Sequence, residues 1–361
     1  MKIPINTPDI DEEEIREVIK VLSEKSLTSS SFDGGTRVQQ FEKLLSKFTK
    51  SKFAISVNSG TAALQASLYA LDIKSGDEVL IPSFTFVATA NSVKSVGAKP
   101  VFVDILEDNY TMDPNDLRKK ITKRTKAVIP VHLYGHIAYM KEILEITTKN
   151  NLKIIEDASQ SLGSKLNGKH SGTFSKLGCF SLYAAKVMTS GEGGAVITND
   201  KKLFEKLKQI RNHGMSKNHL TTTFGLNLRL PEINAAIAKV QIKKLPGLLD
   251  ERKKKAQILT ELLKNYDIIL PKQRKGETLN WYLYTIALKN RNNIMKKLNS
   301  SGIGATIYYS PPIHKTPYYK TKTNLPNTEW AANHVLSLPI HPKVSKSDMI
   351  RVKKIFSNNI K

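Results

Sequence analysis

The amino-acid sequence predicts an α/β fold in which a mostly parallel sheet lies between two layers of helices. Short apolar runs of β-type residues recur along the first two hundred residues, and helical patterns separate several of them. Runs that are apolar on both faces are typical of parallel strands buried under helices on each side. At 361 residues the chain can also bury a large core and hold two domains.

The first predicted elements are two helices. Residues 11–24 begin with acidic side chains and continue with apolar residues at helical spacing, and residues 38–50 repeat that spacing. The stretch 27–36 between them is a loop by composition. The predicted strands are 53–58, 78–83, 99–105, 126–134, 153–159, 179–183 and 195–198. Helical patterns at 61–72 and 87–97 separate the first three strands.

A long helical stretch at about 231–255 indicates the passage into a second, smaller domain. We therefore expect a large domain over residues 1–240 and a small α+β domain over residues 241–361. The small domain mixes strand-like pieces, such as 282–289, with loops and a basic terminal helix.

Composition narrows the classes of protein that the sequence allows. Hydrophobic residues make up 40% and charged residues 24% of the chain, which is ordinary for a soluble globular protein. No apolar run approaches the ~20 residues that span a bilayer, and the acidic N-terminal stretch lacks an export signal. We expect a cytoplasmic protein with no membrane partner. The single cysteine, Cys179, excludes an intramolecular disulfide and a cysteine-based zinc cluster, and we expect no metal site.

The formal net charge of +24 is the one unusual global property. It is compatible with a nucleic-acid partner, with attraction of anionic substrates, or with a lysine-rich proteome. The excess is diffuse, and its small clusters at 119–126, 252–255 and 343–354 lie on segments with helical patterns. No helix-turn-helix, RNA-binding sheet motif or zinc finger is recognisable, so we expect no nucleic-acid partner.

In open parallel sheets, ligands bind beyond the carboxyl ends of the strands, and this directs attention to the turns. The first turn, 58–64, reads NSGTAAL. Its free backbone N–H groups at a helix start suit a phosphate, with Gly60 permitting close approach and Thr61 adding a hydroxyl. The alternative is a simple helix cap by Ser59 or Thr61.

The second turn, 82–91, brings Phe84 or Phe86 to the same edge of the sheet. An aromatic ring there could stack on a planar cofactor, or it could be a core residue under the following helix. In the third turn, 154–164, Asp157 follows two buried isoleucines. A carboxylate in that place is costly without a cationic partner, although a helix-capping role is an alternative.

Lys186 follows the strand at 179–183 and precedes a glycine-rich turn. A lysine there can be desolvated enough to act as an amine nucleophile, although a surface lysine is the alternative. A phosphate seat, an aromatic stacker, a buried acid and an amine at one sheet edge are the four groups that pyridoxal phosphate requires. We expect this cofactor.

Several motifs also resemble those of the DegT/StrS-type sugar-nucleotide aminotransferases, which have the aspartate-aminotransferase fold (fold type I) of pyridoxal-phosphate enzymes. The resemblance covers nearly the whole length. The matching stretches are NSGTAAL (58–64), PSFTFVATAN (82–91), PVHLYG (130–135), IIEDASQSLGS (154–164), FSLYAAKVMTSGEGGAVITND (180–200), RNHG (211–214) and FGLNLRLPEINAAI (224–237). The resemblance implies a three-layer α/β/α large domain.

The resemblance also implies roles for individual residues. Lys186 matches the lysine that forms the Schiff base, Asp157 the acid that pairs with the pyridinium nitrogen, and Phe86 the ring-stacking aromatic. The other implied cofactor contacts are Gln160 near the 3′-hydroxyl, and Gly60, Thr61, Ala62, Ser181 and Asn227 at the phosphate. Asn227 matches an asparagine that reaches the phosphate from the neighbouring subunit, which implies a homodimer with shared active sites.

Departures from the family pattern concern specificity. The motif usually written NYRM is NLRL here, with Leu228 and Leu230 in place of Tyr and Met. The loop LTSSSFDGGTRV (27–38), which lies where the family admits substrate, is somewhat longer than the common form. A histidine replaces the Schiff-base lysine in a dehydratase branch of the family, and Lys186 argues against that branch.

The segment 305–319 resembles the part of the family that lines the nucleotide-sugar site. The substrate-contact candidates are Tyr308, Tyr309, His314 and Arg229, for which ordinary loop packing or a structural salt bridge is the alternative. The expected function is transfer of an amino group from glutamate to a nucleotide-diphosphate keto-sugar, a 3- or 4-keto-6-deoxy hexose. The alternatives are a cyclitol aminotransferase, another fold-type-I enzyme such as a lyase, or a regulatory, nucleic-acid-binding relative that has kept the fold.

Overall fold

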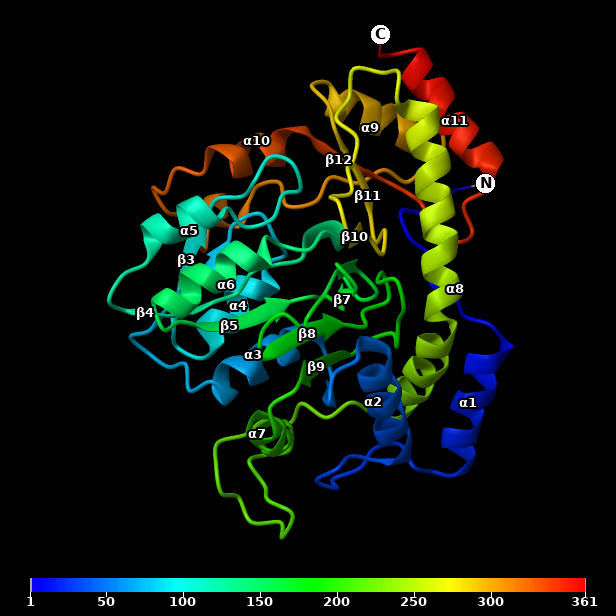
Figure 1. The fold of residues 1–361 in the computed structure, drawn as a ribbon. Coiled ribbons are helices and arrows are strands. Elements are labelled where there is room, and N and C mark those ends of the chain that lie inside the picture. The colour runs from blue at the N-terminus through cyan, green and yellow to red at the C-terminus, as the bar shows by residue number, and fades with distance from the viewer. Residues whose placement is uncertain (1, 361) are drawn as a thin grey trace.

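The computed structural model describes residues 2–360 and shows a central sheet enclosed by helices, with a smaller layered region at one end (Figure 1). The seven strands of the sheet are β1 (Phe53–Val57), β2 (Glu78–Pro82), β3 (Lys99–Val103), β4 (Thr125–Val128), β5 (Lys153–Asp157), β8 (Leu177–Ser181) and β9 (Gly194–Thr198). Their order is β1-β9-β8-β5-β4-β2-β3. Strand β9 is antiparallel to β1 and β8, and the other four neighbouring pairs are parallel. The predicted mostly parallel α/β sheet is confirmed.

The two faces of the sheet bury different helices because alternate residues of each strand point to opposite sides. On β2, Val79 and Ile81 join one core cluster while Leu80 joins another. The first face is covered by α3 (Gly60–Ala70), α4 (Ala88–Ser95) and α7 (Lys201–Arg211). The opposite face is covered by α2 (Thr36–Thr49), α5 (Pro114–Lys120), α6 (Met140–Lys149) and the first half of α8 (Glu232–Leu263). Three layers result, as expected.

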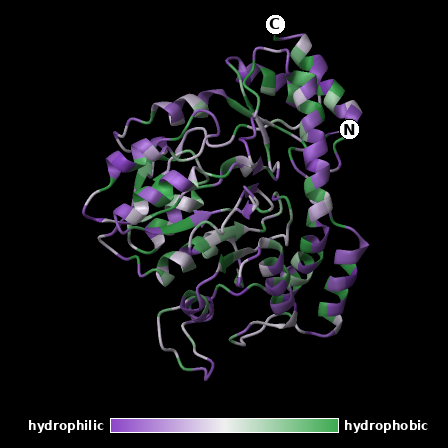
Figure 2. Cartoon of the chain, in the orientation of Figure 1, coloured by the Kyte–Doolittle hydropathy of each residue, from purple (hydrophilic) through white to green (hydrophobic). Residues whose placement is uncertain are grey.

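Local signals in the sequence explain where the helices begin. Helix α1 (Glu12–Ser23) opens with a capping box, in which Asp11 caps the backbone N–H of Glu13 while the Glu14 carboxylate accepts from the Asp11 N–H. Helix α2 ends at Thr49 and is capped by Lys50, which adopts a left-handed conformation. Hydrophobic and hydrophilic residues share α1, α8 and α11 (Lys346–Ser357) in Figure 2, as expected for helices covered on one side.

Helix α8 is 32 residues long and runs from the level of α2 to the level of α9 (Arg291–Ser300), longer than the expected 231–255 (Figure 1). Its second half packs in a separate core with β11 (Tyr284–Ala287), β12 (Val335–Leu338), α9 and α11. Ile3 belongs to this core and pairs with Ile303. The boundary at residue 240 stays a prediction, and we propose that the N-terminal residues belong with the smaller domain.

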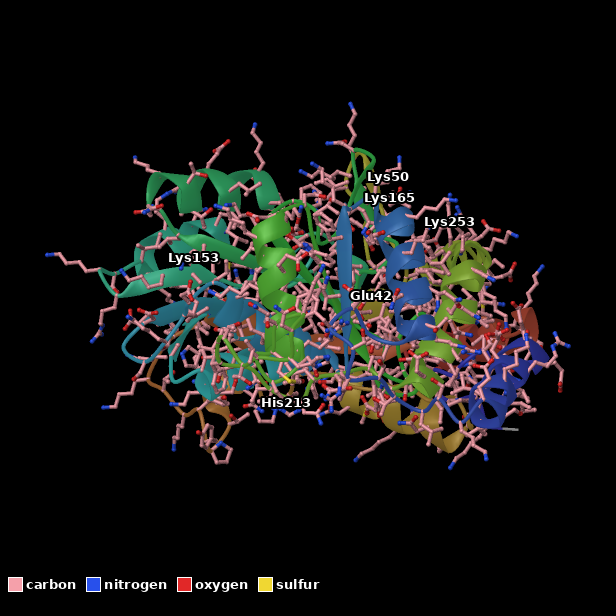
Figure 3. The ribbon with its side chains drawn as sticks, turned by 90° about the horizontal axis from the view of Figure 1, so that it is seen from below. Glu42, Lys50, Lys153, Lys165, His213 and Lys253 are labelled. Carbon is pink, nitrogen blue, oxygen red and sulfur yellow. The ribbon has the colours of Figure 1, made fainter. Side chains whose placement is uncertain are left out.

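The remaining short elements lie around these two cores. A three-stranded sheet is formed by β6 (Lys165–Leu166), β7 (Lys169–His170) and β10 (Glu277–Thr278). Helix α10 (Pro326–His334) precedes β12, and single 3-10 turns occupy Leu133–Gly135 and Ile313–Lys315. None of the helices within residues 2–360 combines the length and apolar character needed to cross a bilayer. Long side chains that end in nitrogen project around the outline of the molecule in Figure 3.

Candidate active site

The predicted turns meet at the carboxyl edge of the parallel strands. The turn after β2 approaches the turn after β5, because the Thr89 hydroxyl donates to Asp157 Oδ2 at 2.9 Å. The Thr89 N–H donates to the carbonyl of Phe86 at 3.1 Å, which ties the aromatic turn to the acid. The turn after β1 approaches the end of β8, where Gly60 lies against Ser181. The Gly60 turn, the Phe86 turn, Asp157 and Ser181 therefore lie at one edge of the sheet.

Asp157 is the last residue of β5, and its side chain is 4% exposed. Its second oxygen, Oδ1, accepts from the backbone N–H of Ser159 at 3.1 Å. Both donors are neutral, and no Lys, Arg or His side chain of the described residues forms an ion pair with this carboxylate. A buried carboxylate without a cation is costly. The carboxylate therefore fits a ligand that brings a protonated heterocyclic nitrogen.

Another buried carboxylate shows the contrast. Glu42 on α2, labelled in Figure 3, accepts from Arg211 Nη1 at 2.6 Å and from the N–H and hydroxyl of Ser56. Burial raises the pKa of Glu42, and the Arg211 guanidinium opposes that rise. Glu42 thus has a protein cation of its own, and its position under β1 assigns it to the scaffold.

The two phenylalanines of the second turn, Phe84 and Phe86, differ in burial. Phe84 is fully buried and packs edge-on against the rings of Tyr134 and Tyr309. Phe86 is 61% exposed, and its turn is joined to Asp157 through Thr89. A ring left open there can cover the face of a planar ligand. Phe86 fits the stacking role, and Phe84 is a core residue.

The first turn caps α3 and leaves donors free. Ser59 is the N-cap, and its hydroxyl accepts from the Ala62 N–H at 3.0 Å. The N–H groups of Gly60 and Thr61, at the first two helical positions, have no acceptor within the helix. A Cβ at Gly60 would lie 2.8 Å from the Ser181 Cβ, so only glycine allows this close approach. The turn suits a phosphate. Ser59 caps the helix, as the alternative proposed, while the N–H groups of Gly60 and Thr61 are left for a phosphate.

Lys186 follows β8 in a tight turn, in which its N–H donates to the carbonyl of Tyr183 at 2.9 Å. The side chain is half-buried, and its Nζ lies 4.7 Å from the centre of the Tyr282 ring. Exclusion of water from the amine lowers the pKa of Lys186 to about 8, while the negative charge of Asp157 opposes that change. Near neutral pH a useful fraction of this amine is unprotonated, as a nucleophile requires.

Gln160 links the acid turn to the C-terminal segment. Its Nε2 donates to the Tyr309 hydroxyl at 2.7 Å, and its Oε1 accepts from the Tyr134 N–H at 3.1 Å. The Tyr309 ring stacks on Tyr134 and lies 5.8 Å from the ring of Tyr308. Burial raises the pKa of Tyr308 to about 12. Both C-terminal tyrosines therefore lie beside the site as neutral phenols.

A small cavity lies beside Lys186, Gln160 and Ser181. Its lining residues are Ser159, Gln160, Leu162, Ser181, Lys186, Val187, Met188, Asn280 and Tyr282. The donors at the α3 start, the unpaired buried acid, the exposed ring and the amine of lowered pKa together match the phosphate, ring nitrogen, ring face and aldehyde of pyridoxal phosphate. The residues present fit this group.

Two of the predicted substrate-contact residues, His314 and Arg229, make contacts within the protein instead. His314 is fully buried, with Nδ1 2.7 Å from the Ser83 hydroxyl and Nε2 3.2 Å from Glu329. Burial lowers the pKa of His314 although Glu329 raises it. Both ring nitrogens thus have protein partners, which favours the packing alternative for this residue. Arg229 donates to the Asn212 side chain at 2.7 Å, a structural contact rather than an ion pair.

Asn227 pairs with Asn212 at the base of the loop that follows α7, and this loop projects from the molecule in Figure 1. Its side chain is exposed, and its carbonyl accepts from the Asn58 amide, next to the phosphate turn of the same chain, at 3.4 Å. The reach of Asn227 into a neighbouring subunit stays a prediction.

Sequence reasoning missed Thr89, Tyr282 and Asn280. Thr89 lies one helical turn after Phe86, where a hydroxyl facing the acid turn could have been suspected. Asn280 donates to the carbonyls of Gln160 and Leu162, and it supports the acid turn from below. No local signal marks Asn280 or Tyr282, because they lie in the irregular connection between β10 and β11, far in sequence from the turns they contact.

The chain matches the family model described as the DegT/DnrJ/EryC1/StrS aminotransferase family over residues 8–357. It is 36% identical over 339 residues to the UDP-N-acetyl-3-dehydro-alpha-D-glucosamine 3-aminotransferase of Acidithiobacillus ferrooxidans, covering 93% of this chain and 92% of that protein. It is 35% identical over 346 residues to the dTDP-3-amino-3,4,6-trideoxy-alpha-D-glucose transaminase of Streptomyces venezuelae, covering 94% and 91%.

Solved structures agree with the sequence matches. The crystal structure of DesV from S. venezuelae, in complex with a ketimine intermediate, superimposes with a TM-score of 0.92 at 33% identity, covering 99% of this chain and 98% of that one. The fold-type-I architecture predicted from the motifs is confirmed by this match.

Proposed function

Because the chain belongs to the DegT/DnrJ/EryC1/StrS aminotransferase family, we propose that it transfers an amino group from glutamate to a nucleotide-linked keto-sugar, with pyridoxal phosphate as cofactor. The observation that carries this proposal is the meeting of Lys186, Asp157 and the Gly60 turn at one edge of the sheet. The names of the two relatives described above, one acting with a UDP sugar and one with a dTDP sugar, support the substrate class.

The cofactor supplies, when bound, an electron-accepting ring for amino-group chemistry. Asp157 would hold a protonated ring nitrogen, because its buried carboxylate has only the neutral donors Thr89 and Ser159. The N–H groups of Gly60 and Thr61 would bind the phosphate at the positive end of α3. Phe86 would cover one face of the ring and exclude water from it.

Lys186 is the residue that attaches the cofactor and then moves the proton. Its pKa of about 8 leaves about half of the amine neutral at pH 8. A neutral amine can accept a proton from the α-carbon of glutamate and later return one. The nearby Tyr282 ring limits where the Lys186 amine can lie.

The sugar would enter beside the C-terminal tyrosines. Tyr308 and Tyr309 lie next to Gln160 and can contact a sugar hydroxyl. The net charge of +24 would attract both a dicarboxylate donor and a diphosphate substrate. The nucleotide, and amination at C3 or C4, are left open in this proposal.

We propose a homodimer with shared active sites as the working assembly. The projecting loop before Asn227 exposes Leu220 and Phe224, which are 64% and 57% exposed. Exposed apolar side chains on a protruding loop are typical of a protein contact. In such a dimer Asn227 would approach the phosphate of the second subunit.

The proposal is tested with purified protein loaded with pyridoxal phosphate. Glutamate alone should give one 2-oxoglutarate per active site, and continued turnover should require a keto-sugar from a panel of UDP-, dTDP- and GDP-linked 3- and 4-keto hexoses. Lys186→Ala should abolish both results. Lys153→Ala should leave them unchanged, because this exposed lysine, labelled in Figure 3, lies at the amino end of β5, opposite the end that carries Asp157. Turnover with a keto-cyclitol only would replace the sugar assignment. No 2-oxoglutarate together with salt-sensitive DNA binding would replace the enzymatic assignment.

A further inference from the structure

The side chain of Asn6 connects the lysine turn to the interior of the second domain. Its Nδ2 donates to the carbonyl of Ala185, the residue before Lys186, at 2.7 Å. Its Oδ1 accepts from Arg252 Nη2, also at 2.7 Å. The three residues come from the N-terminal segment, the β8–β9 connection and α8. A single carboxamide therefore joins parts of the chain that are distant in sequence.

Arg252 is a buried cation of an unusual kind. It is 2% exposed, and no carboxylate of the described residues forms an ion pair with it. Its other contacts are the carbonyls of Trp281 and Tyr282, which accept from Nη1 at 3.2 and 3.3 Å. Burial lowers the pKa of Arg252 to about 10, and Tyr282 opposes that change. A buried guanidinium without a carboxylate partner is costly. This cost indicates that the hydrogen bonds it donates serve a specific function.

The contacts of Arg252 and Asn6 converge on Lys186 from two sides. Through Asn6, the guanidinium holds the backbone just before Lys186. Through the carbonyl of Tyr282, it holds the residue whose ring lies 4.7 Å from the Lys186 amine. We propose that Asn6 and Arg252 form a clamp that positions Lys186 for its reaction. The proposal rests on the function assigned to Lys186 above.

The course of the N-terminal segment supports this reading. Ile3 exchanges backbone hydrogen bonds with Gly302 and Gly304 in the second domain, and the Pro4 carbonyl contacts His341. The chain then runs along α8 to α1 (Figure 1), and Gln241 of α8 donates to the Asp9 carbonyl. Both ends of the segment are thus fixed, and Asn6 lies between them at the height of the lysine turn.

Substitution of Asn6 by aspartate separates positioning from simple stabilisation. Asn6→Asp keeps an oxygen for Arg252 and adds the missing negative charge, so folding stability should be kept or raised. The carboxylate has no hydrogen for the Ala185 carbonyl and repels it. A clamp therefore predicts a loosened lysine turn in a stable protein.

The readout is the titration of Lys186 in the full-length chain freed of cofactor. Acetic anhydride labels neutral amines, and mass spectrometry of chymotryptic peptides gives the labelling of Lys186 at each pH. In the wild type the midpoint should lie near the lowered pKa of about 8. Access of water in Asn6→Asp should raise the midpoint by about one pH unit, which lowers the neutral fraction at pH 8 about fivefold. Asn6→Ala should raise the midpoint as well. Arg252→Lys should show a smaller rise, because its single nitrogen keeps the charge but cannot replace the two nitrogens, Nη1 and Nη2, that reach Tyr282 and Asn6.

Thr260→Val is the matched control. It lies two turns further along α8 and removes one hydrogen bond to the Tyr284 hydroxyl, with no contact to the lysine turn. Its Lys186 titration should equal that of the wild type. The charge of the new carboxylate in Asn6→Asp also raises the pKa of a nearby amine, so the neutral variant decides. An unchanged Lys186 midpoint in Asn6→Ala would overturn the clamp. The titration needs no cofactor, so it can be interpreted even if the amino-transfer assay fails. Conversely, an unchanged titration would not contradict the proposed function.

Discussion

Replacement of Gly60 by alanine tests whether the close approach of the α3 start to Ser181 holds the cofactor phosphate. The added Cβ would lie 2.8 Å from the Ser181 Cβ and 3.3 Å from its Cα and Oγ. Ordinary contacts begin near 3.4 Å, so either the turn or the end of β8 must move by several tenths of an ångström. Overpacking of this kind costs about 1–3 kcal/mol. If this cost destabilises the cofactor-bound state relative to the free protein, cofactor affinity drops about 5- to 150-fold.

The assay is equilibrium titration of the cofactor-free protein with pyridoxal phosphate, followed by absorbance. Gly247→Ala is the matched control, because a Cβ there meets nothing within 4 Å and alanine favours the helix interior. Its cofactor affinity should equal that of the wild type. A Gly60→Ala protein that folds and binds the cofactor with wild-type affinity would refute the reasoning that places the phosphate at this turn.

Three further predictions concern the acid, the amine and pH. Asp157→Asn should lower turnover about a hundredfold or more, because a neutral amide cannot balance the charge of a protonated ring nitrogen. Steady-state kinetics on protein that keeps its cofactor absorbance measures this, and near-normal turnover would contradict it. Lys186→Ala should keep the circular dichroism of the wild type while turnover is lost, and residual turnover above about one per cent would point to another amine. Burial lowers the pKa of Lys186 to about 8, and only the neutral amine reacts, so the rate of cofactor binding should rise with pH through 8 and then level off. Stopped-flow absorbance measures this rate, and a rate that does not change from pH 6 to 9 would contradict the prediction.

The order of elements was predictable because strands, turns and helix caps leave local signals. The turns at Gly60, Asp157 and Lys186 follow buried runs directly, and a parallel sheet brings such turns to one edge. The run 126–134 was predicted too long, since β4 ends at Val128. Pro130 lacks a donor for the ladder, and Tyr134 adopts a left-handed conformation.

Other features depended on tertiary packing and could not be predicted locally. Strand β9 is antiparallel to β8, and the connection through Lys186 between them contains no helix of the kind that usually forms a parallel crossover. The choice between Phe84 and Phe86 was made by packing against Tyr134 and Tyr309. The clamp of Asn6 and Arg252 has no sequence pattern at all, because its members lie more than two hundred residues apart.

The central claim is that Lys186 is the amine to which pyridoxal phosphate attaches. Borohydride reduction of the loaded protein fixes the cofactor on that amine, and mass spectrometry of the digested chain then locates it. The account predicts one cofactor adduct per chain, on the peptide that contains Lys186. The absence of an adduct, or an adduct on any of the other lysines, would contradict it.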